Sequence, residues 1–175
     1  IVSDVGSTKK EIVLKLDKLF PRYVGSHPLA GSEKRGILNA NADIFKNSVC
    51  ILTPVKSTHK QSLRKIRRFW NILGARVVSI NPSLHDNILS LVSHLPHLIA
   101  FCLMGVVPKK YLRFAASGFK DATRIASSDV AVWSDIFISN RKSILKAAGA
   151  FQNYLSKAKT RIKEKDAKGL EGILK

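Results

Sequence analysis

The first eighty residues alternate between two patterns of apolar positions. Short apolar runs predict four strands, over residues 1–5, 23–24, 48–52 and 75–80. Apolar positions at the helical period predict a helix after the first strand and another after the third, over residues 8–20 and 58–73. Strands that alternate with helices are typical of the end of a doubly wound α/β sheet.

Both predicted helices carry signals at their ends. Thr8 with Glu11, and Thr58 with Gln61, have the spacing of a capping box, in which side chains bind the free backbone amides of the first turn. Gly74 follows the second helix, where a glycine commonly ends one. We therefore expect residues that are close in the sequence to cap both helices.

From Asn81 onward the sequence shows no convincing strand pattern. Asn81 suits a helix cap and Pro82 suits the first position of a helix, so a boundary is predicted near residue 81. The predicted fold class is an α/β remnant in residues 1–80 followed by an all-α region in residues 81–175. The chain as a whole should be predominantly helical.

The helical region should end in one long helix that begins near Ser128. Its apolar residues alternate spacings of four and three, as in a coiled-coil seam, at Ile144, Ala148, Phe151, Leu155, Ala158 and Ile162. Such a seam must pack on another helix, which a second subunit could supply. The charged tail from Lys163 is expected to fray.

Composition excludes several classes of protein. With 45% hydrophobic residues the chain can build a core, which argues against disorder. Cys50 and Cys102 each lie in an apolar run, so we expect buried free thiols in a reducing compartment, not a disulfide or a metal pair. The apolar window 88–107 is long enough to span a membrane, but polar residues such as Ser93 and His94 at its centre favour a buried helix of a soluble protein.

The net charge of +18 is large for 175 residues. A lysine-rich solvated surface explains most of it. One predicted helix also concentrates side chains that would suit nucleic acid, at Lys60, Arg64, Lys65, Arg67 and Arg68. Trp70 falls on the face that this helix should bury, and the interleaved aromatic residues of a single-strand binder are missing, so nucleic acid is the lesser alternative. A positive field would also steer small anions.

The helix predicted over residues 82–105 has a distinctive polar face. Viewed along its axis, a polar stripe contains Asp86, Ser90, Ser93 and His97. His85 and His94 lie on opposite sides of this stripe. A solvent-facing stripe in so basic a protein should contain lysine or arginine, and none occurs between Pro82 and Val107. The stripe is either a solvated face or the lining of a cavity, and the missing long charges favour the cavity.

Two further residues could carry chemistry. His27 follows a predicted strand in a loop bracketed by Gly25 and Gly31, and functional residues concentrate at such strand ends. Taken alone, His27 is as well explained by a turn histidine with a local hydrogen bond, and Arg124 by a surface arginine.

Several short segments follow one another in a characteristic order. They are Asp4-Val5-Gly6-Ser7, Gly25–Glu33, Leu52-Thr53-Pro54, His85-Asp86, Ser93-His94-Leu95-Pro96-His97, Gly118–Ala126 and Trp133-Ser134-Asp135-Ile136. Together they resemble the prephenate and arogenate dehydrogenases of tyrosine biosynthesis, over nearly the whole chain. That family opens with a Gly-rich turn that binds the dinucleotide pyrophosphate, and no G-x-G-x-x-G occurs here. We therefore expect the chain to be the back half of such an enzyme, and to be inactive alone.

The resemblance implies an oxidative decarboxylation, in which prephenate becomes 4-hydroxyphenylpyruvate as a hydride passes to NAD or NADP. By the same resemblance His27 accepts the proton of the carbinol hydroxyl, Ser7 lies between nicotinamide and substrate, and Arg124 binds a carboxylate through two hydrogen bonds. The other implied substrate contacts are Ser93, His94, His97, Lys120 and Trp133, with Asp121 beside them. The cofactor end of the site would comprise Asp4, Val5, Gly6 and Ser7, and no metal is implied.

The resemblance also divides the chain and suggests its partners. Residues 1–80 would be the C-terminal part of a dinucleotide-binding domain, and residues 81–175 a helical substrate-binding and dimerisation domain. The protein would be a cytoplasmic homodimer that acts on a small molecule, with neither membrane nor nucleic acid as a partner. Arogenate dehydrogenase remains an alternative, and NAD and NADP are not distinguished. A non-catalytic basic helical dimer is the alternative if the chain is the whole product.

Overall fold

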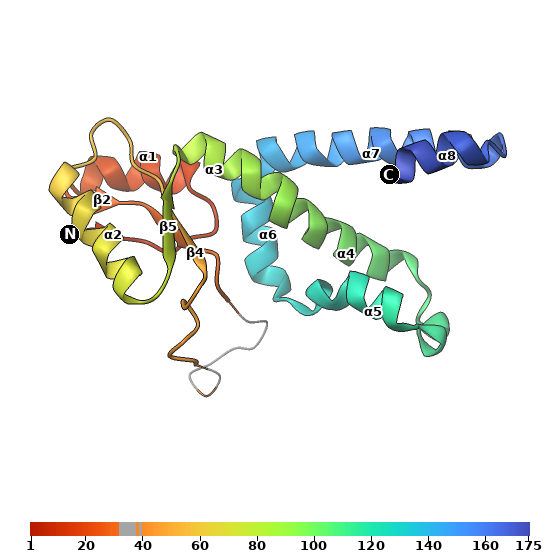
Figure 1. Ribbon diagram of the computed structural model, residues 1–175, viewed down its shortest axis with the longest axis horizontal. Helices are drawn as coiled ribbons and strands as arrows, with labels where there is room; N and C mark the ends of the chain where they lie inside the picture. The colour runs from red at the N-terminus through yellow and green to blue at the C-terminus, as the bar shows by residue number, and fades with distance from the viewer. Residues whose placement is uncertain (32–37, 39) are drawn as a thin grey trace.

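The computed structural model describes residues 1–31, 38 and 40–175. An α/β unit lies at one end, and two helical arms extend from it (Figure 1). One arm contains α4 and α5, and the other is the hairpin of α7 and α8 (Figure 1). The predicted fold class, an α/β remnant followed by helices, is confirmed.

The described part of the α/β unit contains two small sheets and two helices. Its elements are β1 (Val2–Ser3), α1 (Lys10–Leu19), β2 (Tyr23–Val24), β3 (Ser26–Pro28), β4 (Val49–Leu52), α2 (Lys60–Ile72) and β5 (Arg76–Ser79). Strands β1 and β2 pair in parallel, and so do β4 and β5, with one helix in each connection. The loop predicted around His27 is wrong, because Ser26–Pro28 form β3, which pairs antiparallel with β4 and places His27 opposite Ile51.

Gly25 separates β2 from β3 and lets the chain change sheets. A Cβ atom at this position would lie 2.4 Å from Oγ1 of Thr53 and 2.9 Å from Cγ2 of Val13. The Gly25 carbonyl accepts a hydrogen bond of 2.9 Å from the Thr53 amide, which ties the two sheets together. This close approach requires glycine and positions His27 two residues later.

The core of the α/β unit lies between β4 and α2. Its buried members are Cys50, Leu52, Trp70 and Ala75. Trp70 is buried, as predicted, and its indole nitrogen donates to Oγ of Ser26 at 3.2 Å. A basic helix therefore covers the sheet with its apolar face and leaves most of its charges in solvent.

The predicted capping box at the start of α1 is wrong. The cap position is Lys9, and no side chain nearby in the sequence caps the helix. The carboxylate of Asp86, 77 residues along the chain, instead accepts the backbone amides of Lys9 at 2.8 Å and Lys10 at 2.9 Å. The hydroxyl of Thr8 accepts from Ser139. A buried carboxylate satisfies two amides at once and complements the positive end of the helix dipole, so it replaces the local cap.

The second predicted capping box is also wrong, by one residue. His59 caps α2 by accepting the Ser62 amide, while the hydroxyl of Thr58 accepts the Val55 amide before the helix begins. The predicted stop is confirmed, because Gly74 has φ +84, a conformation that favours glycine.

The helical region begins as predicted and then departs from regular α-helix. Asn81 accepts the Leu84 amide at 2.8 Å and caps α3 (Pro82–Leu89). A π-helical turn over Ser90–His94 follows, and then α4 (Leu95–Val106). Together these elements form one helical segment, Pro82–Val106, which is called the rod below. The helix predicted over residues 82–105 is therefore interrupted by a wider turn, which rotates every later side chain relative to α3.

The remaining helices are shorter and more numerous than predicted. A 3₁₀ segment (Lys109–Phe114), α5 (Ser117–Thr123), a 3₁₀ turn (Arg124–Ser127), α6 (Val130–Ser139), α7 (Arg141–Lys163) and α8 (Ala167–Leu174) follow α4. The single long helix predicted from Ser128 is interrupted at Asn140. The tail does not fray: α8 packs back on α7, where the Tyr154 hydroxyl donates to the Ile173 carbonyl at 3.0 Å.

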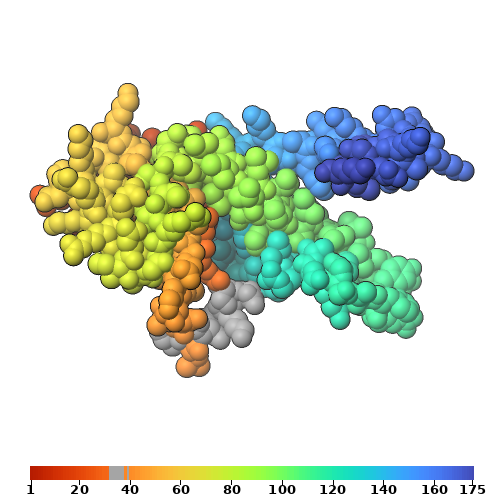
Figure 2. Space-filling view, in the orientation of Figure 1, coloured from red at the N-terminus to blue at the C-terminus, as the bar shows by residue number. Residues whose placement is uncertain are grey.

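Much apolar surface of the two arms is exposed. The rod Pro82–Val106 has the length and mean hydropathy, 1.7, of a membrane-spanning helix, yet only 22% of its apolar window is buried within the chain. The predictions that this helix and Cys102 are buried are thus wrong for the single chain. The seam of α7 runs from buried Ile144 to largely exposed Ile162. Figure 2 shows the arms separated by an open wedge.

Candidate functional site

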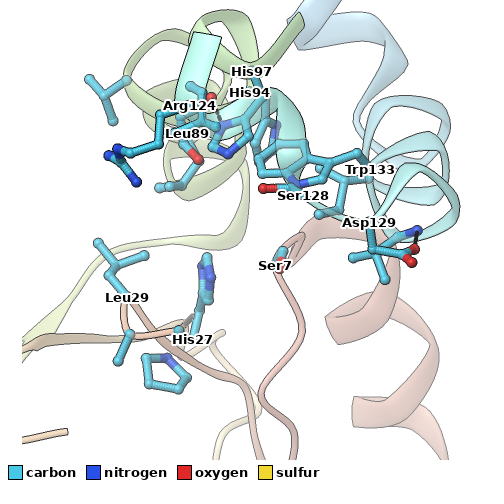
Figure 3. A pocket seen from close by; sticks show the side chains of 18 residues that line it. Ser7, His27, Leu29, Leu89, His94, His97, Arg124, Ser128, Asp129 and Trp133 are labelled. Carbon is cyan, nitrogen blue, oxygen red and sulfur yellow. Dashed lines mark hydrogen bonds between the residues drawn. The ribbon is translucent and has the colours of Figure 1, made fainter. Parts of the chain in front are cut away.

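A cavity of about 660 Å³ lies between the α/β unit and the helices. It brings together seven of the residues selected from the sequence, namely Ser7, His27, Ser93, His94, His97, Arg124 and Trp133. Figure 3 shows His27 on one side of the cavity, with His94, His97 and Arg124 on the other and Ser7 between them. Ser93 and His97 of the polar stripe, with His94 beside it, therefore line a cavity, while His85, Asp86 and Ser90 are buried, so the stripe is not a solvated face.

Four other selected residues do not line this cavity. Lys120 is exposed on α5, and Val5 is exposed after β1. Gly6 is half-buried, and Asp4 binds neighbouring groups instead. Ser32 and Glu33, at the end of the His27 segment, lie outside the described residues.

His27 belongs to a buried chain of three side chains. Its Nδ1 lies 2.8 Å from Nε2 of His85, and Nδ1 of His85 lies 2.8 Å from a carboxylate oxygen of Asp86. His85 is fully buried, and His27 is 8% exposed, at the cavity. These three hydrogen-bonded side chains thus connect Asp86, whose carboxylate caps α1, to the cavity.

Hydrogen-bond polarity along this chain fixes the tautomer of both rings. The ionised Asp86 can only accept, so His85 donates from Nδ1, and the uncharged form of this ring then accepts at Nε2. His27 must then donate from Nδ1, which leaves its Nε2 as an unprotonated acceptor. Burial, followed by the fields of His85, Lys9 and His94, lowers the pKa of His27 to about 3. The ring is therefore a neutral hydrogen-bond acceptor near pH 7.

Asp86 stays ionised although it is buried. Burial alone would raise the pKa of Asp86, but hydrogen bonds from His85 and from the amides of Lys10 and Lys9 lower it below its usual range. The same carboxylate caps α1 and orients His85. Asp86 therefore fixes both the start of α1 and the orientation of His85 behind His27.

His94 is held in the opposite tautomer. The side-chain amide of Asn140 donates to the Asp86 carbonyl at 2.8 Å, which identifies its nitrogen, and this nitrogen lies 3.1 Å from Nδ1 of His94. Nδ1 of His94 therefore accepts, and its Nε2 carries the proton. Burial lowers the pKa of His94 to about 4, so this ring is also neutral.

His97 and Trp133 form a flat aromatic wall. Their ring centroids are 3.5 Å apart at an interplanar angle of 18°. Nδ1 of His97 donates to the Ser93 carbonyl at 2.9 Å, across the wide turn. Burial and the nearby charge of Arg124 lower the pKa of His97, while that hydrogen bond opposes them. An arginine thus shares the cavity with three uncharged imidazoles.

A second hydrogen-bond network, around Asp4 and Lys9, lies next to Ser26, the residue before His27. The ammonium of Lys9 contacts the Asp4 carboxylate and donates to the Ser26 carbonyl at 2.8 Å. Asp4 also accepts from the Tyr23 hydroxyl at 2.6 Å and from the Gly6 amide at 2.9 Å. Burial alone would raise the pKa of Asp4, but Lys9 and these hydrogen bonds lower it.

Lys9 and Asn140 were not selected from the sequence. His85 and Asp86 were noted only in or beside the polar stripe and as part of a segment that carried the resemblance, and their polar character was a usable signal. Lys9 and Asn140 gave no such signal, because their roles depend mainly on contacts with residues 17 to 77 positions away.

A smaller cavity of about 360 Å³ lies on the other side of Ser7, between α1 and α6. It shares Ser7, Val132 and Ile136 with the larger cavity. Ser7 follows the carboxyl end of β1, where doubly wound sheets bind ligands. Among the described residues, no group of three or more His, Cys, Asp or Glu side chains could hold a metal ion.

Comparison with known proteins agrees with this architecture. Residues 1–79 match the family model "Prephenate dehydrogenase, nucleotide-binding domain", and residues 81–175 match "Prephenate dehydrogenase, dimerization domain". A prephenate dehydrogenase of Bacillus subtilis is 36% identical over 97% of this chain and 48% of its own length. A cyclohexadienyl dehydrogenase of Zymomonas mobilis is 37% identical over 95% of this chain and 60% of its own length.

Solved structures give the same result. Prephenate dehydrogenase from A. aeolicus, in complex with hydroxyphenyl propionate and NAD+, superposes with a TM-score of 0.92 at 37% identity, over 99% of this chain and 63% of that one. Synechocystis arogenate dehydrogenase superposes with a TM-score of 0.86 at 27% identity, over 99% of this chain and 66% of that one. The chain thus spans about half to two thirds of the length of these relatives. It belongs to the prephenate dehydrogenase family.

Proposed function

We propose that this chain supplies the substrate site and the proton acceptor of an enzyme that oxidatively decarboxylates prephenate to 4-hydroxyphenylpyruvate. The observation that carries the proposal is the His27–His85–Asp86 chain, which presents an unprotonated nitrogen to a cavity that also contains Arg124. An acceptor and a cation in one cavity suit a substrate with a hydroxyl and a carboxylate.

The reaction needs a hydride acceptor, and the chain can accommodate the nicotinamide end of one. Ser7 stands at the carboxyl end of β1 and lines both cavities, so a ring in the smaller cavity and a substrate in the larger one would meet beside it. NAD or NADP, when bound, takes up the hydride that leaves the carbinol carbon. Ser7, with Asp4, Val5 and Gly6 before it, would form this end of the cofactor site.

His27 would handle the proton of the carbinol hydroxyl. As the hydride leaves, that oxygen becomes carbonyl-like and its proton must be taken or shared by a neighbouring base. A neutral imidazole with a free Nε2 can do this, and the tether to His85 holds the ring in the required tautomer. Loss of the ring carboxylate as carbon dioxide then makes the product aromatic.

The other side chains would bind and orient the substrate. Arg124 can hold a carboxylate through two parallel hydrogen bonds. His94 offers a donor and His97 an acceptor, while the His97–Trp133 stack provides a flat wall for the ring. Ser93 lines the same wall. Lys120 and Asp121, exposed on α5, would act on the cavity only from outside it.

We further propose that residues 1–80 are the end of the dinucleotide-binding domain and residues 81–175 the substrate-binding and dimerisation domain of a cytoplasmic homodimer. The exposed apolar faces of α4 and α7 support this, since so much apolar surface usually marks an interface. A second copy would cover the rod Pro82–Val106 without any membrane.

Steady-state kinetics of the complete enzyme test the proposal. His27→Asn should lower kcat by about 10²–10⁴-fold with little change in KM. Arg124→Ala should raise KM by about ten- to a hundredfold, the worth of a charge-assisted hydrogen bond. Arg68→Ala, an exposed position on α2, is the matched control and should change neither. An unchanged kcat in His27→Asn would refute the assignment.

Arogenate is the second candidate substrate, because the relatives include a cyclohexadienyl dehydrogenase and an arogenate dehydrogenase. The two substrates differ in the charge of the side chain. Assaying both with the same enzyme decides the matter, since kcat/KM tenfold higher for arogenate would reassign the substrate and leave the roles of His27 and Arg124 intact.

A further inference from the structure

A buried group of charged and titratable side chains surrounds His27 in the described part of the chain. His85 approaches from α3, His94 from the π-helical turn, Asp4 from the end of β1, and Lys9 from the start of α1. Asp86 lies behind His85. Besides the three imidazoles, the group holds the carboxylates of Asp4 and Asp86 and the amino group of Lys9.

Lys9 contacts both Asp86 and the backbone next to His27. Its backbone amide donates to the Asp86 oxygen that also accepts from His85, and its ammonium donates to the carbonyl of Ser26, the residue before His27. The side chain is fully buried. Burial lowers the pKa of Lys9 from its ordinary 10.5, while the charge of Asp4 and the hydrogen bond to its carboxylate oppose this shift and favour the ammonium form.

We propose that Lys9 is a positioning residue, whose buried charge keeps the His27–His85–Asp86 chain free of an extra proton and so keeps the acceptor nitrogen of His27 directed at the cavity. Lys9 touches neither the substrate cavity nor the reacting atoms. It acts through the ring of His27, and its kinetic effect rests on the proposed function.

The need for such a residue follows from the direction of the hydrogen bonds that join His27, His85 and Asp86. A proton added at Nε2 of His85 would turn that nitrogen from acceptor to donor. Nδ1 of His27 would then have to accept, and the proton of neutral His27 would move to Nε2, the nitrogen that must take the substrate proton. The buried carboxylate of Asp86 and the half-buried one of Asp4, left without a cation, would favour that extra proton, and a positive charge on Lys9 disfavours it.

The first test is kinetic and uses the complete enzyme. Lys9→Met should move the acid limb of the kcat/KM profile, where activity is lost as the histidines gain a proton, upward by about one pH unit or more. The double variant Lys9→Met/Asp4→Asn removes one charge of each sign, so its limb should return most of the way to the wild-type position. Lys18→Met, an exposed lysine of the same helix, should leave the profile unchanged.

The second test needs no substrate and separates this proposal from the proposed function. Long-range ¹H–¹⁵N spectra of histidine-labelled wild-type enzyme should show His27 neutral and protonated at Nδ1 from pH 7 down to pH 5. If Lys9→Met does not fold, this measurement alone decides: a wild-type His27 that is charged, or protonated at Nε2, at pH 6 overturns the proposal.

If Lys9→Met folds, an unmoved acid limb and unchanged spectra would reduce Lys9 to a structural contact. If instead neither prephenate nor arogenate is turned over, the proposed function fails while the spectra still test Lys9.

Discussion

Replacing Asp86 by Asn should destabilise the fold far more than loss of an ordinary helix cap. Asp86 is 4% exposed and accepts hydrogen bonds from His85 and from the amides of Lys9 and Lys10. Asn keeps one accepting oxygen but turns an NH₂ group towards one of these donors. Hydrogen bonds to a buried charge are worth about 1.5–3 kcal/mol each, so we expect a loss of about 2–4 kcal/mol in the free energy of unfolding.

Urea unfolding at fixed protein concentration measures this loss. With an m-value of about 2 kcal/mol/M, the midpoint at pH 7 should fall by about 1–2 M. The matched control is Asp166→Asn, which removes the same charge from a partly exposed cap of α8 and should cost no more than about 1 kcal/mol. Equal shifts in the two variants would refute the reasoning.

The pH dependence of the same difference gives an independent check. The folded pKa of Asp86 lies below its ordinary value, so its stabilising effect is present above the unfolded pKa and is lost as pH falls through the folded one. The gap between wild type and Asp86→Asn should therefore narrow steadily below about pH 4. A gap that stays constant down to pH 3 would show that the charge of Asp86 contributes nothing.

Four further outcomes are expected. Gly25→Ala should lower the unfolding free energy by about 2 kcal/mol or more, measured by urea, because its Cβ would collide with Thr53. Thr53→Val should be neutral or slightly stabilising in the same assay, since the described residues offer its buried hydroxyl no hydrogen-bond partner. Gly74→Ala should cost about 1–2 kcal/mol, because φ is +84 there, and a thermal scan would detect it. Sedimentation should show a dimer at micromolar concentration, and Phe151→Lys with Leu155→Lys on the exposed seam of α7 should weaken it; a monomeric wild type would contradict the interface.

Patterns that depend on near neighbours were predictable from the sequence. Strands β1, β2, β4 and β5, both helices of the α/β unit, the cap at Asn81 and the stop at Gly74 all follow from periodicity and local backbone preference, whereas β3, with His27, was predicted as a loop. The burial of Trp70 follows in the same way. These features need only a window of a few residues.

Features that depend on distant partners were not predictable. Thr8 had the right spacing to cap α1, but a carboxylate 77 residues away from Lys9 bonds the amides more strongly than a local hydroxyl can. The break at Asn140 lies in the polar stretch 139–143, but the contacts that this side chain makes there are with Asp86 and His94, 54 and 46 residues away. Pro96 indicated a distortion of this helix, but its form, a wide turn over Ser90–His94, was not predictable from the sequence.

The contacts that escaped prediction are those that join the α/β unit to the helices, and they also orient the histidines. Asp86 comes from the helical region and bonds the start of α1, while Asn140 bonds both Asp86 and His94. Because the site is built from these bonds, its geometry exists only when the two parts of the chain are docked. A substitution that loosens this junction must therefore lower stability and disturb the tautomers of His27 and His94 together. One at the cavity surface, such as Arg124→Ala, removes a ligand contact and leaves the junction intact.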